Sequence, residues 1–313
     1  MVKRVKNDIF VKNNMKLNFG ILAIIVVIAV LGAVPFLVYI ARSPVLIVTE
    51  QAFIGLYGKD RIRREASRSS FALFRPVKTV AVANDSGDDI VPFAVDEVSS
   101  RPFCVIFPLR FARSARLYHE QNPKITVILL EGRFPENSNP SEFALSGGSE
   151  GYFIYKTDIN ADFYRAGLAA ASLNGDKNGS IVVFFDTRIQ RQAREAFMEA
   201  INELENQPDT RFFTSFSQFY DISDLSCVVL AGSGAEYLEK KTGVPVILFS
   251  WLDPELIPSD VVLLVNDSPW AQVLEAVKRV KSGENQGRIR SKFELQKNKK
   301  FDRGILRKIN KMV

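Results

Sequence analysis

The chain has 313 residues, of which 24% are charged, and a formal net charge of +6 at pH 7. Its two cysteines are too few for a disulfide framework. Its single histidine makes a histidine-based metal site or a Ser-His triad hard to build. The positive charge lies at the two ends, and the body between residues 18 and 287 is net acidic. This distribution argues against a nucleic-acid partner for the body.

The first element in chain order is a charge-free apolar run, Leu17–Ala41. A helix rises about 1.5 Å per residue, so this run is long enough to cross a hydrocarbon layer of about 30 Å. Basic residues lie before it, which places residues 1–16 in the cytoplasm. The run is longer than the core of a signal peptide, and its small-x-small pattern is poor, which favours an uncleaved single-pass anchor in the bacterial inner membrane. A cleaved signal peptide is the alternative.

Strand and helix patterns then alternate from residue 44 to residue 135. Apolar, β-branched runs of strand length occupy 44–53, 78–84, 102–108 and 124–132. Helical patterns occupy 57–74, 88–100 and 109–122. This alternation predicts a first α/β lobe over 44–135.

The segment 133–151 is rich in Pro, Asn, Ser and Gly, as is typical of a linker between domains, and the alternation restarts after it. Strands are expected at 151–156, 179–186, 211–216, 226–232, 244–251 and 260–266. Helices are expected at 159–175, 188–207, 234–243 and 268–283. Continuous apolar strands between amphipathic helices predict parallel sheets covered on both faces. We therefore predict an α/β protein with a second lobe over 136–252 and a return to the first lobe through 253–287.

The last segment, residues 288–313, is predicted to be a basic C-terminal tail, with ten basic and two acidic side chains. One hypothesis is a solvated, frayed tail. The other is a helix on anionic lipid, whose apolar face comprises Phe293, Leu295, Phe301, Ile305, Leu306 and Ile309. Cys104 and Cys227 lie inside apolar runs and are expected to be small buried residues.

Four segments of the body resemble the type I periplasmic solute-binding fold and, within it, the basic membrane protein (BMP) family of nucleoside-binding proteins. These segments are 101–133, 152–186, 188–204 and 226–253. The resemblance implies two lobes that close over a small polar ligand, nucleoside-like or sugar-like, with a membrane transporter or receptor as partner and with no cofactor. The chain departs from the family in three places: it has no Phe-Asn pair after the first strand, Ser250–Asp253 replaces a Gly-aliphatic-Asp ending, and an apolar run replaces the lipid anchor.

Ligands of open parallel sheets bind beyond the carboxyl ends of the strands, so polar and aromatic side chains at those ends are the candidate ligand contacts. In chain order they are Glu50, Phe53, Asp85, Arg110, Asp186, Trp251 and Asp253. Trp251 can stack on a ring, and Asp186 and Asp253 can accept hydrogen bonds from ligand hydroxyls. Each also has a structural interpretation, such as capping of the next helix by Asp186.

Motifs of enzymes give little support to a catalytic function. Walker A and G-x-G-x-x-G patterns are missing, and Gly232-Ser233-Gly234 is as typical of a tight turn as of an anion site. We therefore expect a membrane-anchored, exported solute-binding protein or ligand sensor that is not an enzyme. The alternative is a ligand-free structural or interaction module of the cell envelope on the same fold.

Overall fold

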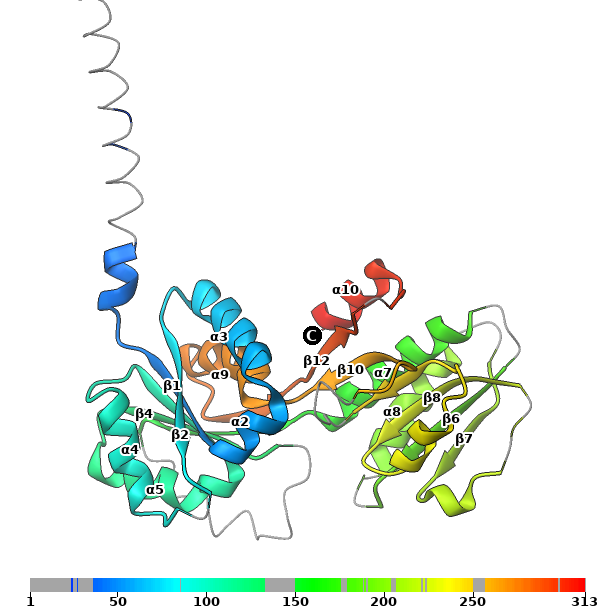
Figure 1. Cartoon of the computed structure of the whole chain (residues 1–313), viewed down its shortest axis with the longest axis horizontal. Coiled ribbons are helices and arrows are strands. Elements are labelled where there is room, and N and C mark those ends of the chain that lie inside the picture. The colour runs from blue at the N-terminus through cyan, green and yellow to red at the C-terminus, as the bar shows by residue number, and fades with distance from the viewer. Residues whose placement is uncertain are drawn as a thin grey trace, which may run out of the picture.

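The computed structural model describes residues 24, 27 and 36–312, apart from 85, 133–149, 176–178, 188, 190, 204–206, 221, 223, 250–256 and 298. Within these residues the chain forms two α/β lobes, which lie next to each other and are joined at the middle of the molecule (Figure 1). Each lobe contains a six-stranded sheet.

Lobe 1 is built around a sheet with the strand order β11-β5-β4-β3-β1-β2, in which all neighbours are parallel. Its strands are β1 (Val45–Glu50), β2 (Val77–Val82), β3 (Cys104–Pro108), β4 (Thr126–Leu130), β5 (Tyr152–Thr157) and β11 (Gln286–Ile289). Its helices are α2 (Gln51–Tyr57), α3 (Lys59–Leu73), α4 (Ile90–Val98), η1 (Leu109–Phe111), α5 (Ala112–Gln121) and α9 (Pro269–Lys281). Apolar side chains of α3 and α9 cover one face of the sheet, and those of α4 and α5 cover the other.

Lobe 2 has the strand order β12-β10-β9-β8-β6-β7, and only β12 is antiparallel to its neighbour. Its strands are β6 (Ser180–Phe185), β7 (Thr210–Phe213), β8 (Leu225–Ala231), β9 (Val246–Leu248), β10 (Val261–Asn266) and β12 (Lys292–Leu295). Its helices are α7 (Ile159–Asn174), α8 (Arg191–Asn202), η2 (Phe216–Gln218), η3 (Ala235–Lys240) and α10 (Arg303–Lys311). The helices α7, α8 and α10 cover one face, and the two short 3-10 helices lie on the other.

The chain passes between the lobes at three crossovers: from β5 to α7, from β10 to α9, and from β11 to β12. The first crossover begins at the carboxyl end of β5, and the second begins at the carboxyl end of β10. All strands of lobe 1, and all strands of lobe 2 except β12, run in the direction of these two strands, so the carboxyl edge of each sheet is turned toward the other lobe. Ligands of open α/β sheets bind beyond such edges, so the space between the two lobes is the expected ligand cleft.

Two of the expected lobe boundaries differ from the structure. The strand at 152–157 was expected in lobe 2, but it pairs with β4 and β11 in the sheet of lobe 1. The strand at 261–266 lies in lobe 2, although the return to lobe 1 was expected from residue 253. Periodicity identifies a buried strand but not the sheet to which it belongs, and the crossovers decide this here.

The basic C-terminal segment is folded, so both hypotheses for it were wrong. Strand β12 pairs with β10, and α10 packs on the core of lobe 2. Phe293 and Ile309 are buried, and Leu295, Phe301, Ile305 and Leu306 pack against the same core. The apolar face that could have met lipid is therefore turned into the protein, whereas Arg303, Arg307, Lys308 and Lys311 are exposed.

Most of the N-terminal apolar run lies outside the described residues, and residues 36–41 are helical. Among the helices that the structure describes, none combines the length and apolarity needed to cross a membrane. The anchor Leu17–Ala41 thus stays a prediction. The buried positions expected for Cys104 and Cys227 are confirmed.

Candidate functional site

At the carboxyl edge of lobe 1, the structure brings two of the predicted residues together. Glu50 ends β1, Arg110 follows β3, and these two strands are neighbours in the sheet. Their side chains form an ion pair. The side chain of Arg110 is 58% exposed and that of Glu50 is 14% exposed, so the pair combines a solvated cation with a more deeply placed carboxylate.

Asn84 is a residue of this edge that the sequence analysis did not select. It follows β2, and its Oδ1 accepts a hydrogen bond of 3.0 Å from the backbone N–H of Ala52, at the start of α2. This contact fixes the end of β2 beside the end of β1. No signal in the sequence indicated this contact, because Asn84 and Ala52 are 32 residues apart and meet only through the pairing of β1 with β2. The predicted Asp85 lies outside the described residues.

Phe53 packs within lobe 1 as part of an aromatic stack. Its ring lies 5.8 Å from that of Tyr57 and 5.6 Å from that of Trp270, measured between centroids. Trp270 in turn donates a hydrogen bond of 3.1 Å from Nε1 to Oγ1 of Thr79. The stack joins α2 to α9, and the ligand contact of Phe53 stays a prediction.

The facing edge of lobe 2 contains Asp186, directly after β6. Its backbone N–H donates to the carbonyl of Ala231 at 3.0 Å, and its carbonyl accepts from the N–H of Ile189 at 2.9 Å. Helix α8 begins at Arg191, so Asp186 does not immediately precede this helix as an N-cap would. Trp251 and Asp253 lie outside the described residues. In the described residues, no group of three or more His, Cys, Asp or Glu side chains is placed to hold a metal ion.

Side chains of both lobes meet at the crossovers, where they form a hinge network. The hydroxyl of Tyr57 lies 2.7 Å from Oγ of Ser268, and Nδ2 of Asn266 donates to the same hydroxyl at 2.9 Å. Burial raises the pKa of Tyr57 to about 12, so its hydroxyl is a neutral hydrogen-bonding group at physiological pH. These bonds connect α2 of lobe 1 with the crossover from β10 to α9.

Ion pairs extend this hinge network to β12. Glu294 of lobe 2 pairs with Arg61 of α3 at 3.0 Å and with Lys292 at 3.3 Å, and Lys292 also pairs with Glu65 of α3 at 2.9 Å. Burial alone would raise the pKa of Glu294, but Lys292 and Arg61 outweigh this effect and lower the pKa below its usual value. Glu294 is therefore ionised at neutral pH, and its ion pairs link the two lobes.

A second buried cluster fixes the crossover from β11 to β12. Asp162 of α7 is fully buried, forms an ion pair with Arg165, and accepts hydrogen bonds from both the backbone N–H and the hydroxyl of Ser291. Arg165 donates a hydrogen bond of 3.0 Å to the carbonyl of Ser291. The crossover backbone is thereby attached to lobe 2.

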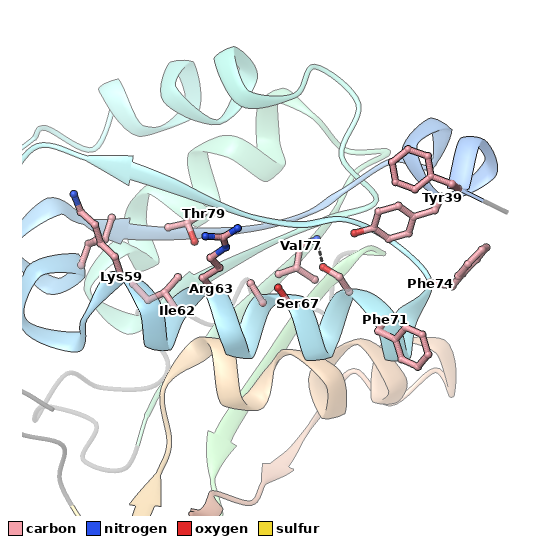
Figure 2. Close-up of a pocket in the computed structure, with 13 residues that line it drawn as sticks. Tyr39, Lys59, Ile62, Arg63, Ser67, Phe71, Phe74, Val77 and Thr79 are labelled. Atoms are coloured by element: carbon pink, nitrogen blue, oxygen red, sulfur yellow. Dashed lines mark hydrogen bonds between the residues drawn. The ribbon is translucent and has the colours of Figure 1, made fainter. Parts of the chain in front are cut away.

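A groove of about 660 Å³ runs along α3 beside β2, one of the two edge strands of lobe 1, and reaches the helical residues 36–41 (Figure 2). None of the seven predicted site residues lines it. Its lining is mostly apolar toward the end of α3, where Figure 2 shows Tyr39, Phe71 and Phe74 at the same end of the groove.

Comparison with known proteins supports the fold and leaves the family undecided. No protein-family model matches the sequence, and no curated protein matches it significantly. The structure is similar to an ABC transporter system solute-binding protein from Conexibacter woesei DSM 14684, with a TM-score of 0.55 and 10% identity over 86% of this chain and 94% of that one. It is also similar to AraP, an arabinose-binding protein from Geobacillus stearothermophilus, with a TM-score of 0.50 and 15% identity over 77% and 87% of the two chains.

A third structure, a transcriptional activator of the comK gene from Bacillus halodurans, has a TM-score of 0.49 and 14% identity over 86% of this chain and 95% of that one. The predicted two-lobed type I periplasmic-binding-protein fold is thus confirmed. At these identities the likeness shows the fold alone, and the BMP family is not shown.

Proposed function

We propose that this protein is an exported solute-binding protein or ligand sensor whose two lobes close over a small polar ligand without catalysing a reaction. The observation that supports it best is topological: the carboxyl edges of a parallel sheet and of a mostly parallel sheet are turned toward each other, and three crossovers join the lobes. A ligand that touches both edges favours the closed arrangement of the lobes by its differential affinity for that arrangement.

The chemistry of the edges favours a ligand rich in hydroxyl groups, such as a sugar or nucleoside. A hydroxyl can donate to a carboxylate and accept from a guanidinium, so the Glu50–Arg110 pair matches such a group on lobe 1. Asp186 offers a carboxylate on lobe 2. Trp251 and Asp253, which follow β9 in the sequence, are proposed to complete this side by stacking and by accepting hydrogen bonds.

One short pattern in the sequence matches a motif of serine hydrolases. Residues 147–151 read Gly-Gly-Ser-Glu-Gly and so match the letters of G-x-S-x-G. A nucleophile elbow requires a strand before the serine and a helix after it, whereas the element that follows this pattern is the strand β5. We therefore do not assign a nucleophile to Ser149.

The membrane part of the proposal keeps Leu17–Ala41 as a single-pass anchor with residues 1–16 in the cytoplasm. Such an anchor would hold the protein beside a membrane transporter or receptor, which we propose as its partner. Its length without charge and the basic residues before it are the supporting observations.

The test is a thermal-shift and calorimetric screen of the full chain in detergent against pentoses, hexoses and nucleosides. A ligand present at about 100 times its Kd should stabilise the folded state by about 2.7 kcal/mol. Arg110→Gln should weaken binding of the identified ligand at least tenfold, whereas Arg113→Gln, an exposed arginine on α5, should not. Binding unchanged in Arg110→Gln would remove this residue from the site.

The second candidate function is a ligand-free interaction module of the cell envelope. It is favoured by the fact that Glu50 and Arg110 already satisfy each other and that Phe53 packs against rings of its own lobe. If no compound of the screen shifts the melting temperature at millimolar concentration, this second function becomes the better explanation.

A further inference from the structure

The end of lobe 1 at which β1 begins carries exposed apolar side chains. In the helical residues 36–41, Phe36, Leu37, Val38 and Ile40 are exposed, and at the end of α3 the side chain of Phe71 is 87% exposed. Phe74, which follows α3, is also exposed. Exposed apolar surface costs about 25 cal/mol per Å², and contiguous patches of it mark sites of interaction. We call residues 36–42 together with Phe71, Phe74 and Arg75 the basal patch.

The two parts of the basal patch are attached to each other. The rings of Tyr39 and Phe74 lie 6.0 Å apart, and the guanidinium of Arg42 lies 4.8 Å from the centre of the Phe74 ring. Arg42 also donates a hydrogen bond of 3.3 Å to the carbonyl of Phe74, and Arg75 donates one of 3.2 Å to the carbonyl of Ser43. The helix at 36–41 therefore has a fixed place beside the end of α3 (Figure 2).

Phe74 occupies a backbone conformation that a phenylalanine rarely adopts. It ends α3 with a φ of 51°, in the left-handed region, where helices usually place glycine. A left-handed residue with a side chain costs about 1–2 kcal/mol. A backbone outlier of this kind is often retained where the side chain has a function, and here the ring is the one that contacts both Tyr39 and Arg42.

The short connection between the apolar run and β1 limits where this patch can lie. Only Arg42, Ser43 and Pro44 separate Ala41 from Val45. The four extended Cα–Cα steps from Ala41 to Val45 span at most about 14 Å, so the start of β1 cannot be farther than this from the end of the run. If the run crosses a bilayer, the basal patch is held at the level of the lipid headgroups.

We propose that the basal patch is inserted into the interfacial layer of the phospholipid bilayer and sets the orientation of lobe 1. This inference rests on the proposed anchor. Tyrosine and arginine side chains are typical of that layer, and phenylalanine and leucine side chains are buried at its boundary with the acyl chains. Lobe 1 is then held against the membrane, and closure of the lobes is a movement of lobe 2 toward it.

The experiment places an environment-sensitive fluorophore on a cysteine in the patch. The two native cysteines are fully buried, so a thiol-reactive dye labels Phe71→Cys selectively. Phe93→Cys is the matched control, because Phe93 is 71% exposed but lies on α4, which covers the other face of the sheet. The labelled full chain is reconstituted into vesicles of phosphatidylcholine and phosphatidylglycerol.

We expect a blue shift and quenching by lipids with spin labels near the headgroup at position 71 and neither at position 93. Equal, water-like emission at both positions in vesicles that carry the protein would overturn the inference and leave the anchor intact. A blue shift at position 71 that appears without lipid, or that grows with the protein-to-lipid ratio, would overturn it in favour of a second copy of the chain. Flotation of the vesicles tests the anchor separately, because a chain that does not float with them lacks the proposed attachment altogether.

Discussion

The hinge and the cleft edge both contain ion pairs between distant parts of the chain, but the two regions differ in burial. At the hinge, the side chains of Arg61, Glu65 and Asp162 are nearly or fully buried. At the cleft edge, Arg110 is mostly exposed. Removing one partner from a buried pair costs about 3–5 kcal/mol, whereas an exposed pair contributes about 0–1 kcal/mol. The hinge pairs therefore stabilise the fold more than the edge pair does, and the proposed exchange of the edge pair for contacts with a ligand would cost little stability.

The largest effect on stability is expected at the hinge for Asp162→Ala. This change leaves the buried guanidinium of Arg165 without its carboxylate and removes the acceptor for Ser291. We expect the free energy of unfolding to fall by about 3–5 kcal/mol, measured by urea denaturation. Asp209→Ala is the control, since Asp209 pairs with Arg211 at the surface, and it should change stability by less than about 1 kcal/mol. Similar values for the two variants would contradict the contrast between buried and exposed pairs.

An intermediate, pH-dependent effect is expected for Glu294→Gln. The pKa of Glu294 is lowered in the folded protein, so its contribution to stability is fully present above the ordinary carboxyl pKa of about 4.3 and is lost as the pH falls through the lower folded value. The wild-type protein should therefore be more stable than the variant at neutral pH. This advantage should shrink on acidification below about pH 4. Urea titrations of both proteins from neutral to acidic pH measure it, and a difference that stays constant with pH would show that Glu294 is not the responsible group.

The smallest effect on stability is expected at the cleft edge for Glu50→Gln. The partner of Glu50 is solvated, so the free energy of unfolding should change by less than about 1 kcal/mol. Affinity for the ligand found in the screen should nevertheless fall, because the amide replaces a charged acceptor with a neutral one. A loss of stability as large as that of Asp162→Ala would mean that the edge pair is structural and would favour the ligand-free function.

Much of the fold could be predicted from the sequence because its strands are continuous apolar runs and its helices are amphipathic. The assignment of strands to lobes could not be predicted, because the sequences of β5 and β10 are apolar like those of their neighbours. Only the crossovers that follow these two strands show where the chain leaves a lobe. The prediction of a solvated or lipid-bound tail for residues 288–313 was wrong for a related reason. The apolar spacing of Phe293 and Ile309 is the same for a helix or strand that faces a protein core and for one that faces lipid.

Single residues of the candidate site could be predicted from the sequence, but their contacts with one another could not. Glu50 and Arg110 are both recognisable as residues at strand ends, but their contact depends on the order in which β1 and β3 lie in the sheet. Asp162 could not be recognised as a hinge residue, because an aspartate in the first turn of a helix usually serves only to offset the helix dipole. Its partner Ser291 is 129 residues away in the chain.

The alternation of the chain between the lobes has a consequence for how the protein is made. Lobe 1 begins at residue 45, yet α9 supplies Trp270, Val273 and Val277 to its core, and β11 supplies one edge of its sheet. Helix α3 covers part of one face of that sheet early, but a nascent chain must leave the part under α9 exposed until residues 269–289 have been synthesised. Contacts this distant in sequence form slowly, so the period before they form is when the chain most needs protection from aggregation.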